Sequence, residues 1–164
     1  MIFETERLII RYVQLEDIER LVEYRNKPEV ARYQSWDRYT TRQAKNRVKY
    51  IERHPFTGKV KDNTQLAVLL KDGTMIGDLH VEVINRLTTT IGYTFDSVYW
   101  HHGYAREAVS ALIEYLKAYF PQEKVIAYIY KQNQASRALL DDLGFKKFDE
   151  SFFYDYEGYV LFIK

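Results

Sequence analysis

The feature that most constrains the fold is the succession of strand-like and helix-like patterns between residues 91 and 145. The apolar pattern IGYTF leads into a short loop containing Gly103, and a long amphipathic helix pattern follows at once. An apolar strand pattern at 124–130 then leads to Asn133 and to a short helix pattern closed by Gly144. This order predicts two strands joined by a crossover helix. Because backbone N–H groups at a helix N-terminus attract anions, it also predicts a phosphate site in the loop.

The rest of the chain places further strand and helix patterns around this unit. The expected strands are residues 7–13, 65–70, 75–84, 88–95 and 124–130, with a closing hairpin of 145–154 and 156–163 around Glu157-Gly158. The expected helices are 18–25 (stopped by Pro28), 41–53, 105–116 (ended by Pro121) and 135–143. The sequence therefore predicts an α/β (α+β) fold in one domain over residues 1–164. Its single mixed, mostly antiparallel sheet has about seven strands flanked by four helices.

Composition removes several classes of function. Lys and Arg total 24 against 23 Asp and Glu, so the net charge of +1 gives no basic field for nucleic acid. The absence of cysteine excludes disulfides, thiolate catalysis and cysteine-based zinc sites. The N-terminus carries acidic residues where a signal peptide needs basic ones, and no stretch is long enough for a membrane span. We expect a cytoplasmic monomer or homodimer that binds neither nucleic acid nor membrane.

The loop before the long helix carries the clearest binding pattern. Gly103 allows the backbone to approach an anion closely, and the N–H groups of residues 101–106 are not consumed by helical hydrogen bonds. Arg106 adds positive charge beside such an anion. The adjacent His101 and His102 point in divergent directions and lack a carboxylate or third histidine at ligand spacing. They indicate a solvated loop pair rather than a metal site.

With these elements in place, the chain resembles the GNAT superfamily of acyl-CoA-dependent N-acyltransferases over nearly its whole length. The family motif at the loop is Gln/Arg-x-x-Gly-x-Gly/Ala. The corresponding segment here is Trp100-His101-His102-Gly103-Tyr104-Ala105. It has Trp in place of Gln/Arg and His where a further Gly is frequent. The opening segment ETERLIIRYVQLEDIERLVEYRNKPEVARY is similar to the branch that acetylates ribosomal-protein N-termini.

The resemblance implies acetyl-CoA as co-substrate and places its parts along this segment. The pyrophosphate is expected at His101, His102, Gly103, Tyr104, Ala105 and Arg106. Backbone groups of Phe95 are expected to bind the pantetheine amides, because family members have a bulge, here at Asp96-Ser97, that separates this strand from the next. Asn133 is expected to cap the short helix and, by family analogy, to approach the cofactor.

Catalytic roles follow partly from the resemblance and partly from spacing. The tyrosine that many family members place four residues before the glycine of LGF is Leu140 here, so Ser136 is the expected proton donor to the CoA sulfur. Thr90 stands where the family often has a glutamate base. His80 and Glu82 share one strand face by period-two alternation and are the candidate bases. Proton transfer to water is the alternative.

The acceptor site is expected between the first two helices. Trp36 and Asp37, with Tyr33 and Tyr39, would form an aromatic rim with one carboxylate, which suits a cationic amine, and Tyr93 could hydrogen-bond the acceptor. Their alternative role is packing. We expect an N-acetyltransferase that transfers the acetyl group directly to a primary amine, such as the N-terminus of a ribosomal or other protein. Two alternatives stay open: a small acceptor such as a polyamine or aminoglycoside, and a non-catalytic acyl-CoA-binding module.

Overall fold

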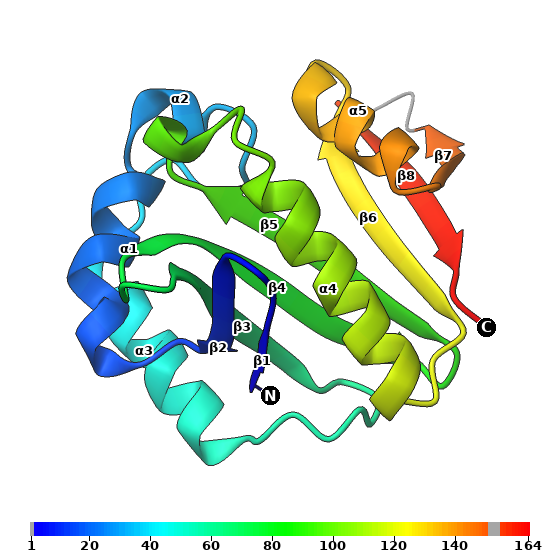
Figure 1. The fold of residues 1–164 in the computed structure, drawn as a ribbon, viewed down its shortest axis with the longest axis horizontal. Helices are drawn as coiled ribbons and strands as arrows, with labels where there is room; N and C mark the ends of the chain where they lie inside the picture. The colour runs from blue at the N-terminus through cyan, green and yellow to red at the C-terminus, as the bar shows by residue number, and fades with distance from the viewer. Residues whose placement is uncertain (1, 151–154) are drawn as a thin grey trace.

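A single eight-stranded sheet forms the centre of the molecule (Figure 1). The computed structural model describes residues 2–150 and 155–164. The strands are β1 (Ile2–Glu4), β2 (Leu8–Tyr12), β3 (Asn63–Leu70), β4 (Met75–Asn85), β5 (Thr88–Phe95), β6 (Lys124–Tyr130), β7 (Lys146–Glu150) and β8 (Tyr156–Phe162). Their order is β1-β2-β3-β4-β5-β6-β8-β7, and β5 and β6 form the one parallel pair among these described strands. The predicted mixed, mostly antiparallel sheet is confirmed. The eighth strand, β1, is too short to show an alternating pattern.

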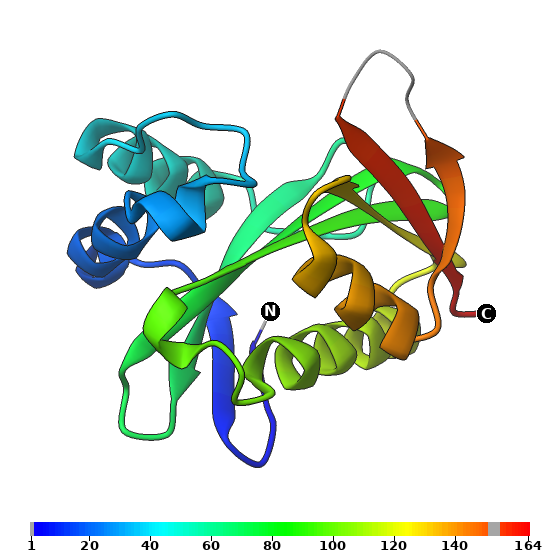
Figure 2. The same cartoon turned by 90° about the horizontal axis from the view of Figure 1, so that it is seen from above.

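Helices cover both faces of the sheet, with α4 and α5 on one face and α1 to α3 on the other (Figures 1 and 2). The helices are α1 (Ile18–Arg25), α2 (Pro28–Ala31), α3 (Thr41–Arg53), α4 (Tyr104–Tyr119) and α5 (Gln134–Asp142), with short 3₁₀ turns η1 (Leu15–Asp17) and η2 (Ser97–Tyr99). The sequence predicted α3 to the residue, because Thr40 and Gln43 form a capping box at its start. Among the described residues, none of the helices combines the length and apolar character needed to cross a membrane.

Pro28 plays a part beyond the one predicted. The first helix ends at Arg25, before Pro28, as expected, but Pro28 also opens the separate helix α2, which the sequence analysis did not predict. Lys27 before it is extended, with ψ of 129°. Proline is well suited to the first helical position, because its fixed φ is helical and its missing N–H has no partner there. This short helix becomes important below, because it forms one wall of the candidate site.

Two apolar cores hold the layers together. The larger core lies between α4 and the sheet, where Leu112 and Leu116 are fully buried. The smaller core packs α1 and α3 against the other face, around Leu21 and Val48. Burying each such side chain contributes about 1.5–3 kcal/mol. The larger core therefore fixes the axis of α4, and with it the position of the loop that precedes α4.

β5 and β6 run together only over their first halves. Their ladder pairs Thr88–Ile91 with Lys124–Ala127, and beyond it the strands diverge (Figure 1). Asp96 N donates to Ile76 O in β4 at 2.9 Å. Because neighbouring strand residues turn their backbone polar groups to opposite edges, the N–H and C=O of Phe95 face the gap. The predicted bulge at Asp96-Ser97 is wrong in position: the strands separate after Ile91, and η2 begins at Ser97.

The C-terminal hairpin is confirmed, but its predicted turn is wrong. Glu157 and Gly158 lie within β8, paired with Glu150 and Asp149 of β7. A Cβ on Gly158 would come within 2.9 Å of the Phe148 ring and 3.0 Å of the Tyr128 ring. This glycine therefore makes room for two aromatic rings rather than for a turn. Residues 151–154 of the predicted hairpin lie outside the described residues.

Candidate active site

A cavity of about 390 Å³ lies where β5 and β6 separate. It is bounded by the end of β5, the loop before α4, the start of α5 and the α2 segment. Nine of the predicted site residues line it: Tyr93, Phe95, His101, Gly103, Tyr104, Ala105, Arg106, Asn133 and Ser136. Tyr33 of the expected acceptor rim and Trp100 of the loop motif also line it. The lining residues without a sequence-based role are Glu29, Val30, Arg32, Gln34, Thr94, Tyr99, Ala135 and Leu139. One cavity thus brings together most of the predicted cofactor residues and an unexpected wall from α2.

The loop before α4 has two residues in the left-handed region. Gly103 has φ of 79° and directly precedes the helix, and His101 has φ of 64°. A residue with a side chain pays about 1–2 kcal/mol for this conformation. The sequence showed a histidine at a place where glycine is frequent, and the backbone indeed adopts a glycine-like angle there. The first N–H groups of α4 have no helical acceptor and open onto this loop.

A set of contacts from the N-terminal hairpin holds this loop in place. Arg7 Nη1 donates to His102 O at 2.9 Å, and Arg7 Nε donates to Glu107 Oε2 in the first turn of α4 at 2.6 Å. Arg7 N and Thr5 Oγ1 both donate to Glu107 Oε1, at 3.0 and 2.5 Å. The guanidinium of Arg7 also lies 4.5 Å from the centroid of the Tyr104 ring. These contacts of Thr5 and Arg7 with His102 and Glu107 are called the latch below. The sequence analysis did not predict the latch, because its partners lie about a hundred residues apart.

Two predicted cofactor residues have side chains engaged elsewhere. The Nδ1 atom of His102 lies 2.7 Å from Trp100 O, its ring stacks on Tyr104, and it does not line the cavity. Arg106 lines the cavity but forms an ion pair with Asp142 of α5, and both side chains are more than half exposed. An anion at the loop would therefore compete with Asp142 for the guanidinium. Exposed pairs of this kind are weak, typically worth up to about 1 kcal/mol.

Asn133 and Ser136 meet at the start of α5. The predicted cap is confirmed: Asn133 Oδ1 accepts a hydrogen bond from Ser136 N at 3.1 Å. The hydroxyl of Tyr93 lies beside Ser136 and donates to its carbonyl at 3.5 Å. Burial raises the pKa of Tyr93 to about 12, although its hydrogen bond with Ser136 opposes the rise. Tyr93 therefore keeps its proton near neutral pH, and it belongs to the Ser136 side of the cavity.

The two candidate bases lie away from the cavity. His80 and Glu82 do share a face of β4 with Asp78, as predicted, but that face points at α1 and α3 and neither residue lines the cavity. Burial, followed by the charge of Arg47, lowers the pKa of His80 to about 4. An imidazole with that pKa is a poor proton acceptor near neutrality. The structure thus favours a packing position for His80.

The face that carries His80 is organised by a buried ion pair. Asp78 is almost fully buried and accepts hydrogen bonds from Arg25, Tyr24 and Gln65. The Arg25 Nη2 to Asp78 Oδ1 distance is 2.9 Å. Removing one partner of a buried pair typically costs about 3–5 kcal/mol, because the other charge is then left unpaired. This network ties α1 to the middle of the sheet.

Trp36 and Asp37 do not form the predicted acceptor rim. Trp36 Nε1 donates to Arg25 O at 3.0 Å, and the Arg25 guanidinium lies 4.1 Å from the centroid of the indole. Asp37 is exposed and lies outside the cavity. Of the predicted rim, Tyr33 does line the cavity, and the α2 segment supplies the rest of this wall with Glu29 and Arg32. The signal in the sequence was Pro28, which starts a new helix there.

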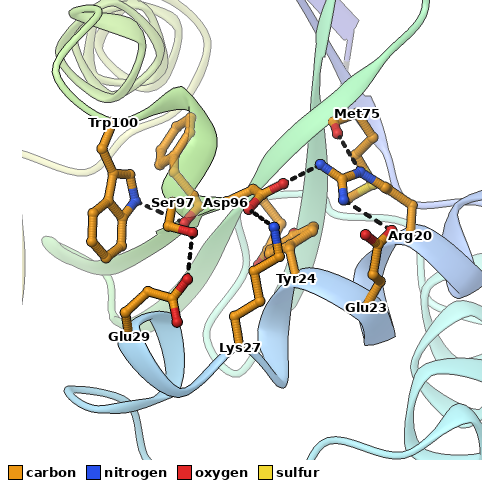
Figure 3. A network of polar contacts seen from close by, with 11 residues as sticks. Arg20, Glu23, Tyr24, Lys27, Glu29, Met75, Asp96, Ser97 and Trp100 are labelled. Carbon is orange, nitrogen blue, oxygen red and sulfur yellow. Dashed lines mark hydrogen bonds and ion pairs between the residues drawn. The ribbon is translucent and has the colours of Figure 1, made fainter.

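A second polar network fixes α2 against the end of β5 (Figure 3). The carboxylate of Asp96 is fully buried and accepts from Lys27 Nζ at 2.6 Å and from Arg20. Burial alone would raise the pKa of Asp96, but these two cations hold it below its usual range. Next along the chain, Ser97 Oγ donates to Glu29 Oε1 at 2.7 Å. The two walls of the cavity are therefore joined by charged contacts.

The Trp100 indole braces the end of β5. Its Nε1 donates to Phe95 O at 2.9 Å, which occupies one lone pair of that carbonyl and leaves the Phe95 N–H facing the gap. Trp100 is the residue that replaces the Gln/Arg of the motif.

Within residues 2–150 and 155–164, no three His, Asp or Glu side chains gather closely enough to hold a metal ion.

Comparison with known proteins agrees with this architecture. Residues 7–146 match the model of the acetyltransferase (GNAT) domain. An uncharacterised N-acetyltransferase p20 of Bacillus licheniformis is 30% identical over 157 residues, 93% of this chain and 85% of that protein. The ribosomal-protein-S5-alanine acetyltransferase of Vibrio fischeri superposes with a TM-score of 0.82 at 22% identity, covering 99% of this chain and 96% of that one.

A further solved structure has a different substrate. It is spermidine N-acetyltransferase of Vibrio cholerae in complex with CoA and spermine, with a TM-score of 0.79 at 13% identity and 96% of each chain covered. The two structural likenesses show the fold, while the domain model and the p20 relative show the family. This chain is an acyltransferase that belongs to the GNAT family of acetyltransferases.

Proposed function

We propose that this enzyme transfers the acetyl group of acetyl-CoA directly to a primary amine. The observation that carries the proposal is the cavity itself, because it joins a helix N-terminus, a free strand edge and a hydroxyl group. These three features match the three parts of acetyl-CoA: the pyrophosphate, the pantetheine amides and the thioester. The solved relative that contains CoA and spermine has the same fold. Membership of an acetyltransferase family weighs against a binding module without turnover.

The loop of residues 101–106 would hold the pyrophosphate. Five of its six residues line the cavity, the first N–H groups of α4 have no helical acceptor, and Gly103 leaves space for an anion near the start of α4. Arg106 would add a positive charge after exchanging Asp142 for the phosphate. The N–H of Phe95, which faces the gap, would bind a pantetheine carbonyl. His102 would contribute through its backbone rather than its ring, because its carbonyl accepts a hydrogen bond from Arg7 and so holds the loop in place.

The chemistry needs a neutral amine and a proton for the leaving thiolate. The amine nitrogen attacks the thioester carbonyl, the C–N bond forms, the C–S bond breaks and the thiolate takes a proton. Ser136 would donate that proton, and Tyr93, which keeps its own proton, would position Ser136. The amine's proton would pass to water, because an α-amine with pKa of about 8 is already partly neutral near pH 7. No acyl-enzyme is needed, and the chain has no cysteine to form one.

The acceptor is a choice between two amine classes. The N-terminal amine of a ribosomal or other protein is our first proposal, and a small amine such as a polyamine or aminoglycoside is the second. The opening segment of the sequence supports the first, and so does the fold shared with the ribosomal-protein acetyltransferase. The spermidine acetyltransferase with the same fold keeps the second open.

The cofactor site is tested by calorimetry with acetyl-CoA. Gly103→Val should weaken binding by at least about tenfold, because the side chain blocks the backbone and disfavours a φ of 79°. Gly73→Val is the matched control, since Gly73 also has positive φ (91°) but lies in the β3–β4 turn, where an added Cβ would have nothing within 4 Å. The control should keep wild-type affinity. Equal affinities for all three proteins would refute the pyrophosphate assignment.

A further inference from the structure

The α2 wall contributes one carboxylate to the cavity. Among the described residues that line it, Glu29 is the only Asp or Glu. Its neighbour Val30 is buried in the smaller core, and Lys27 on the other side is anchored to Asp96 (Figure 3). The backbone on both sides of Glu29 is therefore fixed, which holds this exposed carboxylate at the cavity wall.

One oxygen of Glu29 is used and the other is available. Ser97 Oγ donates to Oε1 at 2.7 Å, and Oε2 has no hydrogen-bond or ion-pair partner from another residue within the described part of the chain. The Ser97 hydrogen bond lowers the pKa of Glu29, so the carboxylate is charged near neutral pH. This contact also orients the Glu29 carboxylate, because it ties the side chain, which comes from α2, to Ser97 of η2. Oε2 is thus a charged acceptor at the edge of a substrate-sized cavity.

The next positive charge on the same wall is Arg32, one helical turn further on. Arg32 lines the cavity, its guanidinium lies 5.0 Å from the centroid of the Tyr33 ring, and it makes no ion pair with the described residues. Residues three apart on a helix are neighbours, with Cβ atoms about 5–6 Å apart. The other cavity guanidinium, Arg106, is paired with Asp142. This wall therefore presents one negative and one positive group side by side.

We propose that Glu29 binds the ammonium form of the acceptor and that Arg32 restricts the acceptor to amines with a single positive charge. The bound ammonium gives its proton to water, and the neutral nitrogen then attacks the thioester. This inference rests on the proposed acetyl transfer and names the substrate class for it. A second ammonium a few bonds from the first would lie near Arg32, where like charges repel. A peptide N-terminus with neutral side chains fits, and so does a monoamine with an apolar body beside Tyr33. Spermidine, with several ammonium groups, does not.

Steady-state kinetics with three acceptors tests the proposal: a tripeptide amide with a free N-terminus and neutral side chains, 2-phenylethylamine, and spermidine. In the wild-type enzyme, kcat/KM should be higher for the two monocationic amines than for spermidine. The peptide and phenylethylamine arms identify which source of amine is preferred. Glu29→Gln should raise KM for the preferred monoamine by about tenfold, the usual effect of losing a charged hydrogen bond. Arg32→Glu should raise kcat/KM for spermidine by a similar factor.

The controls separate recognition from folding. Glutamine can still accept the Ser97 hydrogen bond, so Glu29→Gln keeps the bridge to η2 and loses only the charge. Acetyl-CoA affinity should stay within about twofold. Glu23→Gln makes the same change on an exposed residue outside the cavity (Figure 3) and should leave KM unchanged.

Two outcomes overturn the inference while leaving acetyl transfer intact: a preference for spermidine, or a Glu29→Gln enzyme with wild-type KM. Absence of CoA release with every amine would instead refute the proposed function, and the inference with it.

Discussion

Acidic conditions should destabilise this protein through His80. The imidazole lies between the sheet and α3, near Arg47, and its pKa is about 4 in the fold against 6.5 for a free histidine. Between about pH 6.5 and pH 4, His80 is therefore mostly protonated in the unfolded chain and mostly neutral in the folded chain. The folded-state pKa is depressed, so the stabilisation is complete above pH 6.5 and is lost as the pH falls toward 4. At about pH 4.5 these two pKa values give a loss of about 2.5 kcal/mol.

The measurement is urea unfolding of wild type and His80→Gln at about pH 7.5 and pH 4.5. Glutamine does not titrate, so the variant should lose about 2 kcal/mol less stability between the two pH values. We take about 2 kcal/mol rather than the full figure because His80 keeps some contact with water. His54→Gln, at an exposed histidine beyond the end of α3, is the control and should behave as wild type. If His80→Gln and wild type lost the same stability, the imidazole would not be desolvated as described.

Two further predictions concern catalysis. Ser136→Ala should lower kcat by about 10²–10⁴-fold with little change in acetyl-CoA affinity, because the helix cap uses only the backbone of Ser136. Ser110→Ala on α4 is the control and should keep the wild-type kcat. If Ser136→Ala kept the wild-type kcat while chemistry limits turnover, Ser136 would be a structural hydroxyl. His80→Ala and Glu82→Gln should each retain the wild-type rise of kcat/KM with pH, since neither lines the cavity; loss of the inflection in either variant would identify that residue as the base.

The sequence predicted what local patterns determine. α3 follows from a capping box, β5 and β6 follow from apolar and β-branched runs, and the cap at Asn133 follows from its residue type. The loop at Gly103 was predictable because its backbone angle and its position before a helix are both local properties. Most of the candidate cofactor site lies on these segments, which explains why eight of its nine predicted residues line one cavity.

The sequence did not predict those parts of the site that depend on contacts between residues far apart in the chain. Trp36 and Asp37 looked like an acceptor rim, but an exposed loop and a cavity wall have the same composition, and only the position of Arg25 decides between them. His80 has the ordinary pKa of a base in the sequence and loses it through burial beside Arg47. Glu29 gave no signal, because its role depends on Ser97, which is far away in the chain.

The latch between the N-terminal hairpin and α4 has a consequence for the order of folding. Thr5 and Arg7 are synthesised before their partner Glu107, which follows about a hundred residues later. Contacts of such long sequence separation form late, since the intervening chain must be ordered first. The loop would therefore take its final shape only after β1 and β2 have joined the sheet. A fusion or truncation that disturbs the first seven residues would then leave the protein folded yet lower its affinity for acetyl-CoA.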